Sequence, residues 1–182
     1  MYLVVTRSFP PELGGMQSLM WGLSRELSKN FMIKVFADYI ENHKDFDNEA
    51  SFSIERVGGI KLLRKYRKAQ LINEFIKDNK IEGIIADHWK SLELIKSSKK
   101  KYCLIHSKEI NHTKGSSLNK RVINVLNNID KVIANSQFTK NLAIKCGINE
   151  NNIVVINPGV DPAKELDKKS LDKVESLLKV KT

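Results

Sequence analysis

Two histidines stand directly after short apolar runs, where an imidazole ring is available to a ligand. His88 follows the run 81–86 and Asp87, and His106 ends the run 102–106. Imidazole accepts or donates a hydrogen bond near neutral pH, so either ring could bind a sugar hydroxyl. We predict a binding or catalytic role for both histidines. The alternative is that the two rings serve only the fold.

Glu109 and His112 follow His106 closely and add polar groups to the same segment. Together with His88 they are residue types that bind zinc. No two of these residues are paired four positions apart on one helix, so the spacing does not favour a metal centre. We therefore predict no metal site.

The segment 7–17 joins an apolar run to a helix through two prolines and two glycines. Gly14 and Gly15 would let a ligand approach the backbone at a helix N-terminus, where free N–H groups and the helix dipole favour phosphate. The spacing matches neither G-x-G-x-x-G nor a P-loop, so it supports neither dinucleotide binding nor P-loop hydrolysis. The alternative is a glycine-rich helix start without a ligand.

Positive charge is concentrated in the middle third of the chain. The sequence has 31 Lys and Arg against 21 Asp and Glu, a formal net charge of +10, and residues 61–121 account for the whole excess. Such a cluster attracts phosphate on an anionic membrane or a charged substrate, or it is a solvated helix face. Aromatic residues are not interleaved beyond Tyr66, which disfavours a nucleic-acid partner. The densest cluster is Lys61, Arg64, Lys65, Arg67 and Lys68.

Short apolar runs alternate with segments of helical periodicity. The runs are continuous rather than alternating, which is typical of a parallel sheet covered on both faces. We predict a Rossmann-like doubly wound parallel α/β sheet of about seven strands, with ligands beyond the carboxyl ends of the strands. The expected strands are 2–6, 31–37, 52–57, 81–86, 102–106, 131–135 and 153–156. The expected helices are 14–27, 61–79, 92–95, 118–129, one capped by Ser136 and ending before Gly147, and a terminal helix over 171–178.

Length and composition favour one cytoplasmic globular domain. The 182 residues are 41% hydrophobic and 29% charged, which allows a packed core. No apolar run approaches the roughly 20 residues of a membrane span, and the apolar start is too short for a signal peptide. Cys103 and Cys146 lack metal-ligand spacing and are expected to be reduced thiols.

Three pieces of the sequence carry a family resemblance. They are Phe9-Pro-Pro-x-x-Gly-Gly-Met-Gln17 before a Leu-rich helix, His106 with Glu109, and 131–140 running on to Ile153-Val-Val-Ile-Asn-Pro-Gly-Val-Asp161. Together they resemble the amino-terminal half of group 1 (family 4) glycosyltransferases, which have the GT-B fold. The third piece is the most specific, although Asn157-Pro158 stands where the family usually has Pro-Asn.

The resemblance implies transfer of a sugar from a nucleotide-diphosphate sugar to an acceptor, with retention of configuration and no further cofactor. It also implies a role in building cell-envelope polysaccharides. Gly14 and Gly15 would lie near the donor phosphate or sugar, and His106 would be the catalytic residue. The acceptor-binding residues would be Arg7, Glu12, Gln17, His88 and Glu109.

The resemblance also implies a domain division. Residues 1–161 would form the acceptor-side domain and residues 162–182 a linker with a terminal helix, while the carboxyl-terminal donor-binding domain is absent and the chain alone inactive. Two alternatives stay open. One is a basic module at the inner membrane surface, and the other is a domain like those of sugar-nucleotide epimerases.

Overall fold

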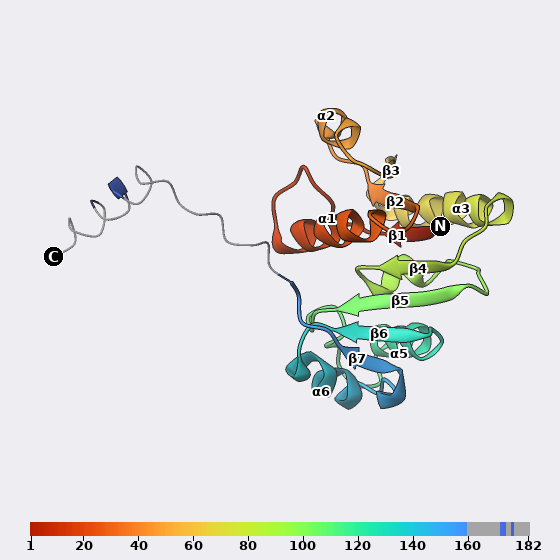
Figure 1. Ribbon diagram of the computed structural model, residues 1–182. Coiled ribbons are helices and arrows are strands. Elements are labelled where there is room, and N and C mark those ends of the chain that lie inside the picture. Colours follow the sequence, from red (N-terminus) through yellow and green to blue (C-terminus); the bar gives the residue numbers. More distant parts are fainter. Residues whose placement is uncertain (160–171, 174–175, 177–182) are drawn as a thin grey trace.

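The computed structural model describes residues 1–159, 172–173 and 176, and parallel strands form its centre (Figure 1). The strands are β1 (Tyr2–Val5), β2 (Ile33–Asp38), β3 (Ser53–Val57), β4 (Gly83–Ala86), β5 (Lys100–Ile105), β6 (Lys131–Ala134) and β7 (Ile153–Val155). The helices are α1 (Gly15–Ser28), α2 (His43–Asn48), α3 (Lys61–Asp78), α4 (Trp89–Leu92), α5 (Ser117–Asn127), α6 (Gln137–Lys145) and the 3-10 turn η1 (Glu150–Asn152). The helix expected over 171–178 and the segment 162–182 lie almost entirely outside the described residues.

The seven strands make one sheet in the order β3-β2-β1-β4-β5-β6-β7. Every pairing is parallel; for example, Tyr2 of β1 is in register with Ile33 of β2 and with Gly83 of β4. This order reverses direction between β1 and β4, as in doubly wound Rossmann-like folds. The predicted fold class is therefore confirmed.

Two apolar clusters cover the two faces of the sheet. Leu3 and Val5 belong to the cluster under α3 to α6, together with the fully buried Trp89. Val4, which lies between them in β1, points to the other face and packs with Met20 of α1. Successive side chains of a strand alternate between faces, so one short run supplies both cores. Helices cover both faces, as the sequence predicted.

Two serine caps fix where helices begin. The Ser116 hydroxyl accepts a 3.2 Å hydrogen bond from the Asn119 N–H, and the predicted cap Ser136 accepts one of the same length from the Thr139 N–H. These bonds satisfy N–H groups that a helix start leaves open. Across the described part of the chain, every helix is too short or too polar to cross a bilayer.

Several boundaries differ from the prediction. Helix α2 stands where a polar loop was expected, because Phe46 is its only large apolar residue and gives no helical periodicity. Strand β2 begins at Ile33 rather than residue 31, and Phe31 and Met32 are 44% and 70% exposed. Helix α4 begins at Trp89, three residues before the expected start.

Candidate active site

The site is built at the carboxyl ends of β1 and β4, where the strand order reverses. The chain after β1 leads to α1 on one face of the sheet, and the chain after β4 leads to α4 on the other. Thr6 and Asp87 follow the two strands directly, and the Thr6 hydroxyl donates a 2.7 Å hydrogen bond to the Asp87 carboxylate. The Arg7 N–H donates to the same carboxylate at 3.0 Å. The side chain of Asp87 thus holds the start of the loop 7–14.

Lys68 reaches beneath this junction from α3. Its ammonium group donates a 2.6 Å hydrogen bond to the Thr6 carbonyl and contacts the carboxylate of Asp38, which ends β2. Lys68 is only 5% exposed, so the prediction that it belongs to a surface basic cluster is wrong. Arg64, one turn earlier on α3, lies 3.4 Å from the same Asp38 carboxylate. Asp38 is therefore shared by two cations.

Burial perturbs the two ionisable groups beneath the junction in opposite directions. It raises the pKa of Asp87, although the hydrogen bonds from Arg7 and Thr6 and the charge of Lys68 oppose the shift. It lowers the pKa of Lys68, against the attraction of Asp38. In each case loss of hydration disfavours the charged form. Burial is the largest cause of both pKa shifts, which indicates that Asp87 and Lys68 support the site from below.

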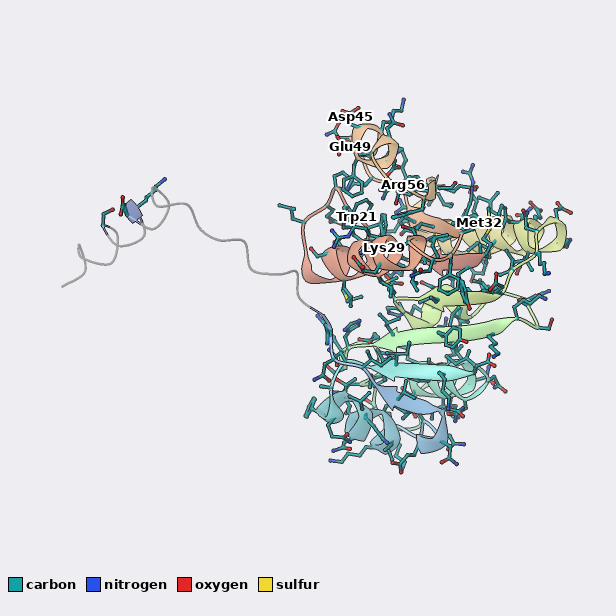
Figure 2. The ribbon with its side chains drawn as sticks, viewed as in Figure 1. Trp21, Lys29, Met32, Asp45, Glu49 and Arg56 are labelled. Carbon is teal, nitrogen blue, oxygen red and sulfur yellow. The ribbon has the colours of Figure 1, made fainter. Side chains whose placement is uncertain are left out.

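An aromatic cluster anchors the loop 7–14. Phe9 is 2% exposed and lies edge-on to Trp21 of α1 and to Phe52, with ring centroids 6.0 and 6.5 Å away. The Arg56 guanidinium lies 5.4 Å from the Phe9 ring and donates a hydrogen bond to the Pro10 carbonyl. Figure 2 shows Trp21 and Arg56 between α1 and α2. The loop is consequently fixed from the core side.

The twin glycines start α1 without being needed by the backbone. Gly14 has φ 162°, which is ordinary extended backbone, and no side chain caps this helix start. A Cβ atom at Gly14 would meet only the flexible end of Gln17, and one at Gly15 would meet no atom within 4 Å. Both glycines are exposed. The start of α1 is therefore exposed and its first N–H groups have no side-chain cap, which is the kind of helix start that can bind an anion.

Two of the predicted acceptor-side residues share a hollow beside the loop. It has a volume of about 320 Å³ and is lined by Arg7, Phe9, Glu12, Asp38, Tyr39, Ile40, Lys61 and Arg64. Gln17 joins this group through Glu12, whose carboxylate accepts a 3.0 Å hydrogen bond from the Gln17 amide. The structure thus brings Arg7, Glu12 and Gln17 together.

His88 is occupied by the helix that it caps. Its Nδ1 accepts a 3.0 Å hydrogen bond from the Lys90 N–H, and its ring lies 5.6 Å from Trp89. Burial, reinforced by the charges of Arg7, Lys90 and His112, lowers the pKa of His88 to about 3. The ring is therefore neutral at physiological pH, and its Nδ1 is engaged in capping α4. His88 lies outside the hollow that Arg7 and Glu12 line.

His106 carries an enclosed nitrogen without a partner. Its Nδ1 lies 3.4 Å from the amide nitrogen of Asn135, which can only donate, so the ring proton belongs on Nε2. Among the described residues, nothing accepts a hydrogen bond from this buried Nε2. A buried donor without a partner is unusual in proteins. A ligand contact at Nε2 requires the covering side chains to shift.

Glu109 closes the end of β5 rather than facing a cavity. One carboxylate oxygen accepts a hydrogen bond from the His106 N–H, and the Glu109 carbonyl accepts a 2.8 Å hydrogen bond from the Trp89 indole. Ser107 between them has φ 101°, a left-handed conformation that costs free energy for a residue with a side chain. One carboxylate oxygen is thus engaged by the backbone at His106, and the acceptor-binding role of Glu109 stays a prediction.

The predicted glycines and histidines all lie along one edge of the sheet. In Figure 1 the arrowheads of β4, β5 and β6 point to the side on which α1 begins. His88, His106, Glu109 and His112 do not assemble as metal ligands, and residues 1–159 contain no other group of that kind. The arrangement offers hydrogen-bond donors and an anion-binding helix start to a polar ligand.

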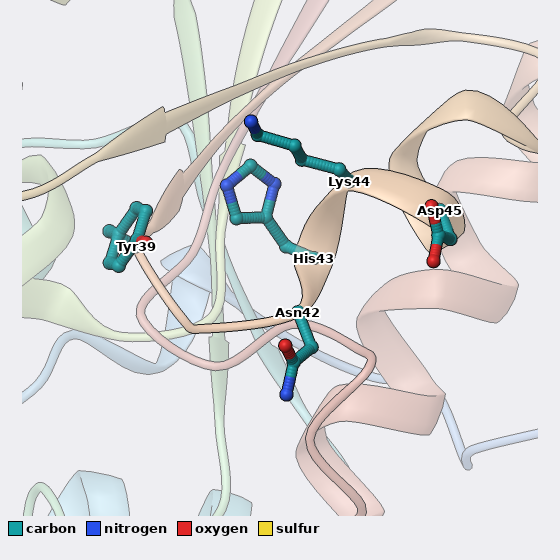
Figure 3. Close-up of a pocket in the computed structure, with 5 residues that line it drawn as sticks. All are labelled: Tyr39, Asn42, His43, Lys44 and Asp45. Carbon is teal, nitrogen blue, oxygen red and sulfur yellow. The ribbon is translucent and has the colours of Figure 1, made fainter.

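A second hollow of about 300 Å³ lies beside the start of α2 and was not predicted from the sequence. Figure 3 shows its lining, with the His43 ring between Tyr39 and Lys44. His43 Nδ1 pairs with Asp47 at 2.7 Å, and Asp47 also binds Arg56 at 2.7 Å. These contacts connect α2 to β3 and, through the bond from Arg56 to the Pro10 carbonyl, to the loop 7–14. Their signal in the sequence is only a run of polar residues.

Comparison with known proteins identifies the family and the fold. The sequence profile of Glycosyltransferase Family 4 matches residues 13–164. A search of curated protein sequences found no match. Alr3699/HepE of Anabaena, solved with UDP-glucose, superposes with a TM-score of 0.73 at 16% identity over 99% of this chain and 50% of its own. A glycosyltransferase from Rickettsia africae superposes with a TM-score of 0.68 at 19% identity over 98% of this chain and 50% of its own.

UDP-GlcNAc 2-epimerase from Methanocaldococcus jannaschii has the same fold, with a TM-score of 0.58, 15% identity and coverage of 87% of this chain and 46% of that enzyme. The chain thus spans about half the length of the solved structures it resembles. The fold alone does not distinguish transferases from epimerases. The family profile, which covers most of the sequence, identifies the chain as a member of a glycosyltransferase family. The chain belongs to Glycosyltransferase Family 4, as an amino-terminal domain of the GT-B type.

Proposed function

We propose that this chain is the acceptor-binding half of a retaining glycosyltransferase that uses a nucleotide-diphosphate sugar. The observation that carries the proposal is the unpaired Nε2–H of His106 on the edge where α1 opens its first N–H groups. The helix start would hold donor phosphate, and His106 would donate to the transferred sugar or its leaving oxygen. Family membership and the UDP-glucose bound to Alr3699/HepE support this assignment.

Catalysis of this kind depends on position and charge. The hollow beside Arg7 would orient the acceptor, and fixed donors would stabilise the negative charge that develops on the departing diphosphate. Attack on the face from which the diphosphate leaves would retain the anomeric configuration. No covalent nucleophile is required in this scheme, and the residues on the edge supply none in an obvious position.

The donor-binding half is expected from a second domain, because the solved relatives are about twice as long. We expect chain 1–182 alone to show no sugar transfer and to bind UDP-sugars weakly. Isothermal titration and a product assay with a panel of nucleotide sugars test this. Micromolar donor affinity or turnover by the chain alone would contradict the division of labour.

His106 is tested in a protein that carries both halves. His106→Ala should lower kcat by about 10²- to 10³-fold, the range seen when one donor to a developing charge is removed. The exposed Lys77→Ala on α3 is the matched control and should leave kcat unchanged. NMR of the anomeric proton in the product checks retention. Equal kcat for His106→Ala and the wild type would remove His106 from the mechanism.

An epimerase of the same fold is the second candidate, on the strength of its structural likeness alone. Incubation of the two-domain protein with UDP-GlcNAc and no acceptor separates the two reactions. Epimerised nucleotide sugar supports the second candidate, whereas the transferase leaves the donor unchanged.

We propose that the reaction takes place in the cytoplasm, where free thiols such as those of Cys103 and Cys146 are the usual state of cysteine.

A further inference from the structure

We propose that the start of α3 docks on an anionic bilayer and offers the adjoining hollow to a membrane-anchored acceptor that carries phosphate. This inference rests on the proposed transferase function and adds the class of acceptor. It combines two observations that share one helix end. One is a cluster of exposed apolar side chains, and the other is an excess of positive charge around the hollow.

The apolar cluster lies on and just before the first turns of α3. Ile60, Leu62, Leu63 and Tyr66 are 71%, 82%, 59% and 53% exposed. Four large apolar side chains within seven residues are more than the scattered exposed apolar residues of an ordinary surface. Their exposure has no counterpart at the other end of the helix, where Phe75 and Ile76 pack against the core. We call Ile60, Leu62, Leu63 and Tyr66 the α3 corner.

Basic residues surround the α3 corner. Lys61 and Arg67 are exposed, and the ammonium group of Lys65 lies 4.7 Å from the Tyr66 ring. In the part of the chain that the structure describes, the Lys61 and Arg67 side chains form no ion pair. Apolar side chains flanked by Lys and Arg are the pattern of helices that lie in a bilayer interface. Anionic headgroups supply the complementary charge.

The hollow continues this positive surface. Lys61 and Arg64 line it from α3, and Arg7 lines it from the loop after β1. Its two carboxylates are Glu12 and Asp38, and Asp38 is shared between Arg64 and buried Lys68. With Lys68 counted, four cations stand against two carboxylates, so the net charge around the hollow is positive. A phosphate ester is the ligand chemistry that such a lining favours.

The exposed apolar side chains of the α3 corner favour a lipid-borne phosphate over a free phosphate. A free phosphorylated sugar could use the cations but would gain nothing from Leu62, whose side chain is more than four-fifths exposed. A lipid-borne phosphate uses both, because the corner enters the interface while the phosphate stays at headgroup level beside Lys61. Corner and hollow share Lys61 and Arg64 as neighbours, so one orientation on the bilayer satisfies both.

Vesicle sedimentation without any sugar donor tests the docking. The wild-type chain should bind vesicles of phosphatidylcholine and phosphatidylglycerol and should ignore vesicles of phosphatidylcholine alone. Ile60→Ser with Leu62→Ser should weaken binding at least about tenfold. Met32→Ser is the matched control, because Met32 is 70% exposed and precedes β2, whereas the corner follows the end of the parallel strand β3 at the opposite edge of the sheet. Lys61→Gln with Arg67→Gln should weaken binding about 25-fold, whereas Lys77→Gln with Lys80→Gln at the other end of α3 should not.

A second arm tests the hollow. Addition of a polyprenyl phosphate to phosphatidylcholine vesicles should restore binding of the wild type, and Arg7→Gln should abolish that gain while leaving phosphatidylglycerol binding intact. Inorganic pyrophosphate is the free competitor. If pyrophosphate binds the chain as tightly as the vesicles do, the ligand is not lipid-borne and the proposal is overturned.

The outcomes separate this inference from the transferase function. Equal vesicle binding by wild type and corner variants, or none by either, rejects the docking while the transfer assays stand unaffected. Loss of transfer with intact vesicle binding rejects the enzyme assignment and leaves a membrane-binding module. Because every side chain substituted here is exposed, circular dichroism should show unchanged folding in each variant.

Discussion

The hydroxyl of Thr6 donates a 2.7 Å hydrogen bond to the carboxylate of Asp87, and this bond joins β1 to β4 where the sheet reverses its strand order. Lys68 approaches the same point from α3 and binds the Thr6 carbonyl. Two strand ends and one helix are thereby held by polar contacts at the base of the site. The loop that carries Arg7 begins on this junction.

Lys68→Ala should destabilise the fold by about 3 kcal/mol, because it leaves the Thr6 carbonyl without its buried donor and removes one of the two cations that contact Asp38. Lys68→Met keeps the volume and should recover part of that loss. Urea unfolding measures both. Lys77→Ala is the exposed control and should change the free energy of unfolding by less than about 0.5 kcal/mol. A Lys68→Ala variant as stable as this control would show that the buried contacts contribute nothing.

His88 should make the protein sensitive to acid. The pKa of the native ring is about 3, below the ordinary 6.5, so the unfolded chain takes up a proton in this range while the native chain does not. The free energy of unfolding should therefore fall as pH decreases from 6.5 to 3, by roughly 1.4 kcal/mol per pH unit from this group.

His88→Asn isolates that effect, because asparagine can cap α4 but does not titrate. The difference in free energy of unfolding between wild type and His88→Asn should shrink towards acid pH. The raised pKa of Asp87 acts in the opposite sense, but it is common to both proteins and cancels in the difference. A difference that is constant with pH would mean that the pKa of His88 is the same in the native and the unfolded chain.

Gly15→Ala separates folding from donor binding. A Cβ at Gly15 meets no atom within 4 Å, and alanine favours a helix, so stability should rise by up to about 1 kcal/mol. Gly22→Ala, within α1 and equally open, should stabilise as much. In a two-domain protein only Gly15→Ala should raise KM for the nucleotide sugar. The same KM in both variants would place the donor elsewhere.

Ser107→Gly should stabilise the protein by about 1 kcal/mol, because glycine adopts φ 101° without strain. Ser98→Gly, at an exposed position without positive φ, should give no gain. Thermal unfolding at one pH compares the two variants. If Ser107→Gly is less stable than the wild type, the serine side chain stabilises the turn after His106 by more than its backbone costs.

The sequence predicted the sheet well because most strands contain a short, continuous apolar run between polar segments, whereas β3, with the sequence Ser-Ile-Glu-Arg-Val, alternates. The family resemblance implied Arg7, Glu12 and Gln17 as acceptor-side residues, and the structure brings these three together beside the loop 7–14. It could not predict α2, since a helix held by Asp47, Arg56 and a single phenylalanine lacks apolar periodicity. Tertiary contacts rather than propensity stabilise such a helix.

Charges were the weakest part of the prediction. Lys68 lies in a run of exposed basic residues, and only the three-dimensional path of α3 places it under Thr6. The hydrogen bond between Glu109 and the His106 N–H was also not predicted, because side-chain spacing does not show a contact to a backbone N–H. Asp38 and Asp87 gave a usable signal, since each follows a buried run directly.

Asp38 accepts from Lys68 with one oxygen and lies 3.4 Å from Arg64 with the other. A single anion therefore balances a cation of the interior and a cation of the ligand-facing wall. In the proposed transferase, a substitution at Arg64 that suits a different acceptor would therefore also change the charge balance of Asp38 and Lys68 at the strand junction. Under that proposal, acceptor preference and the stability of the strand junction are coupled through Asp38.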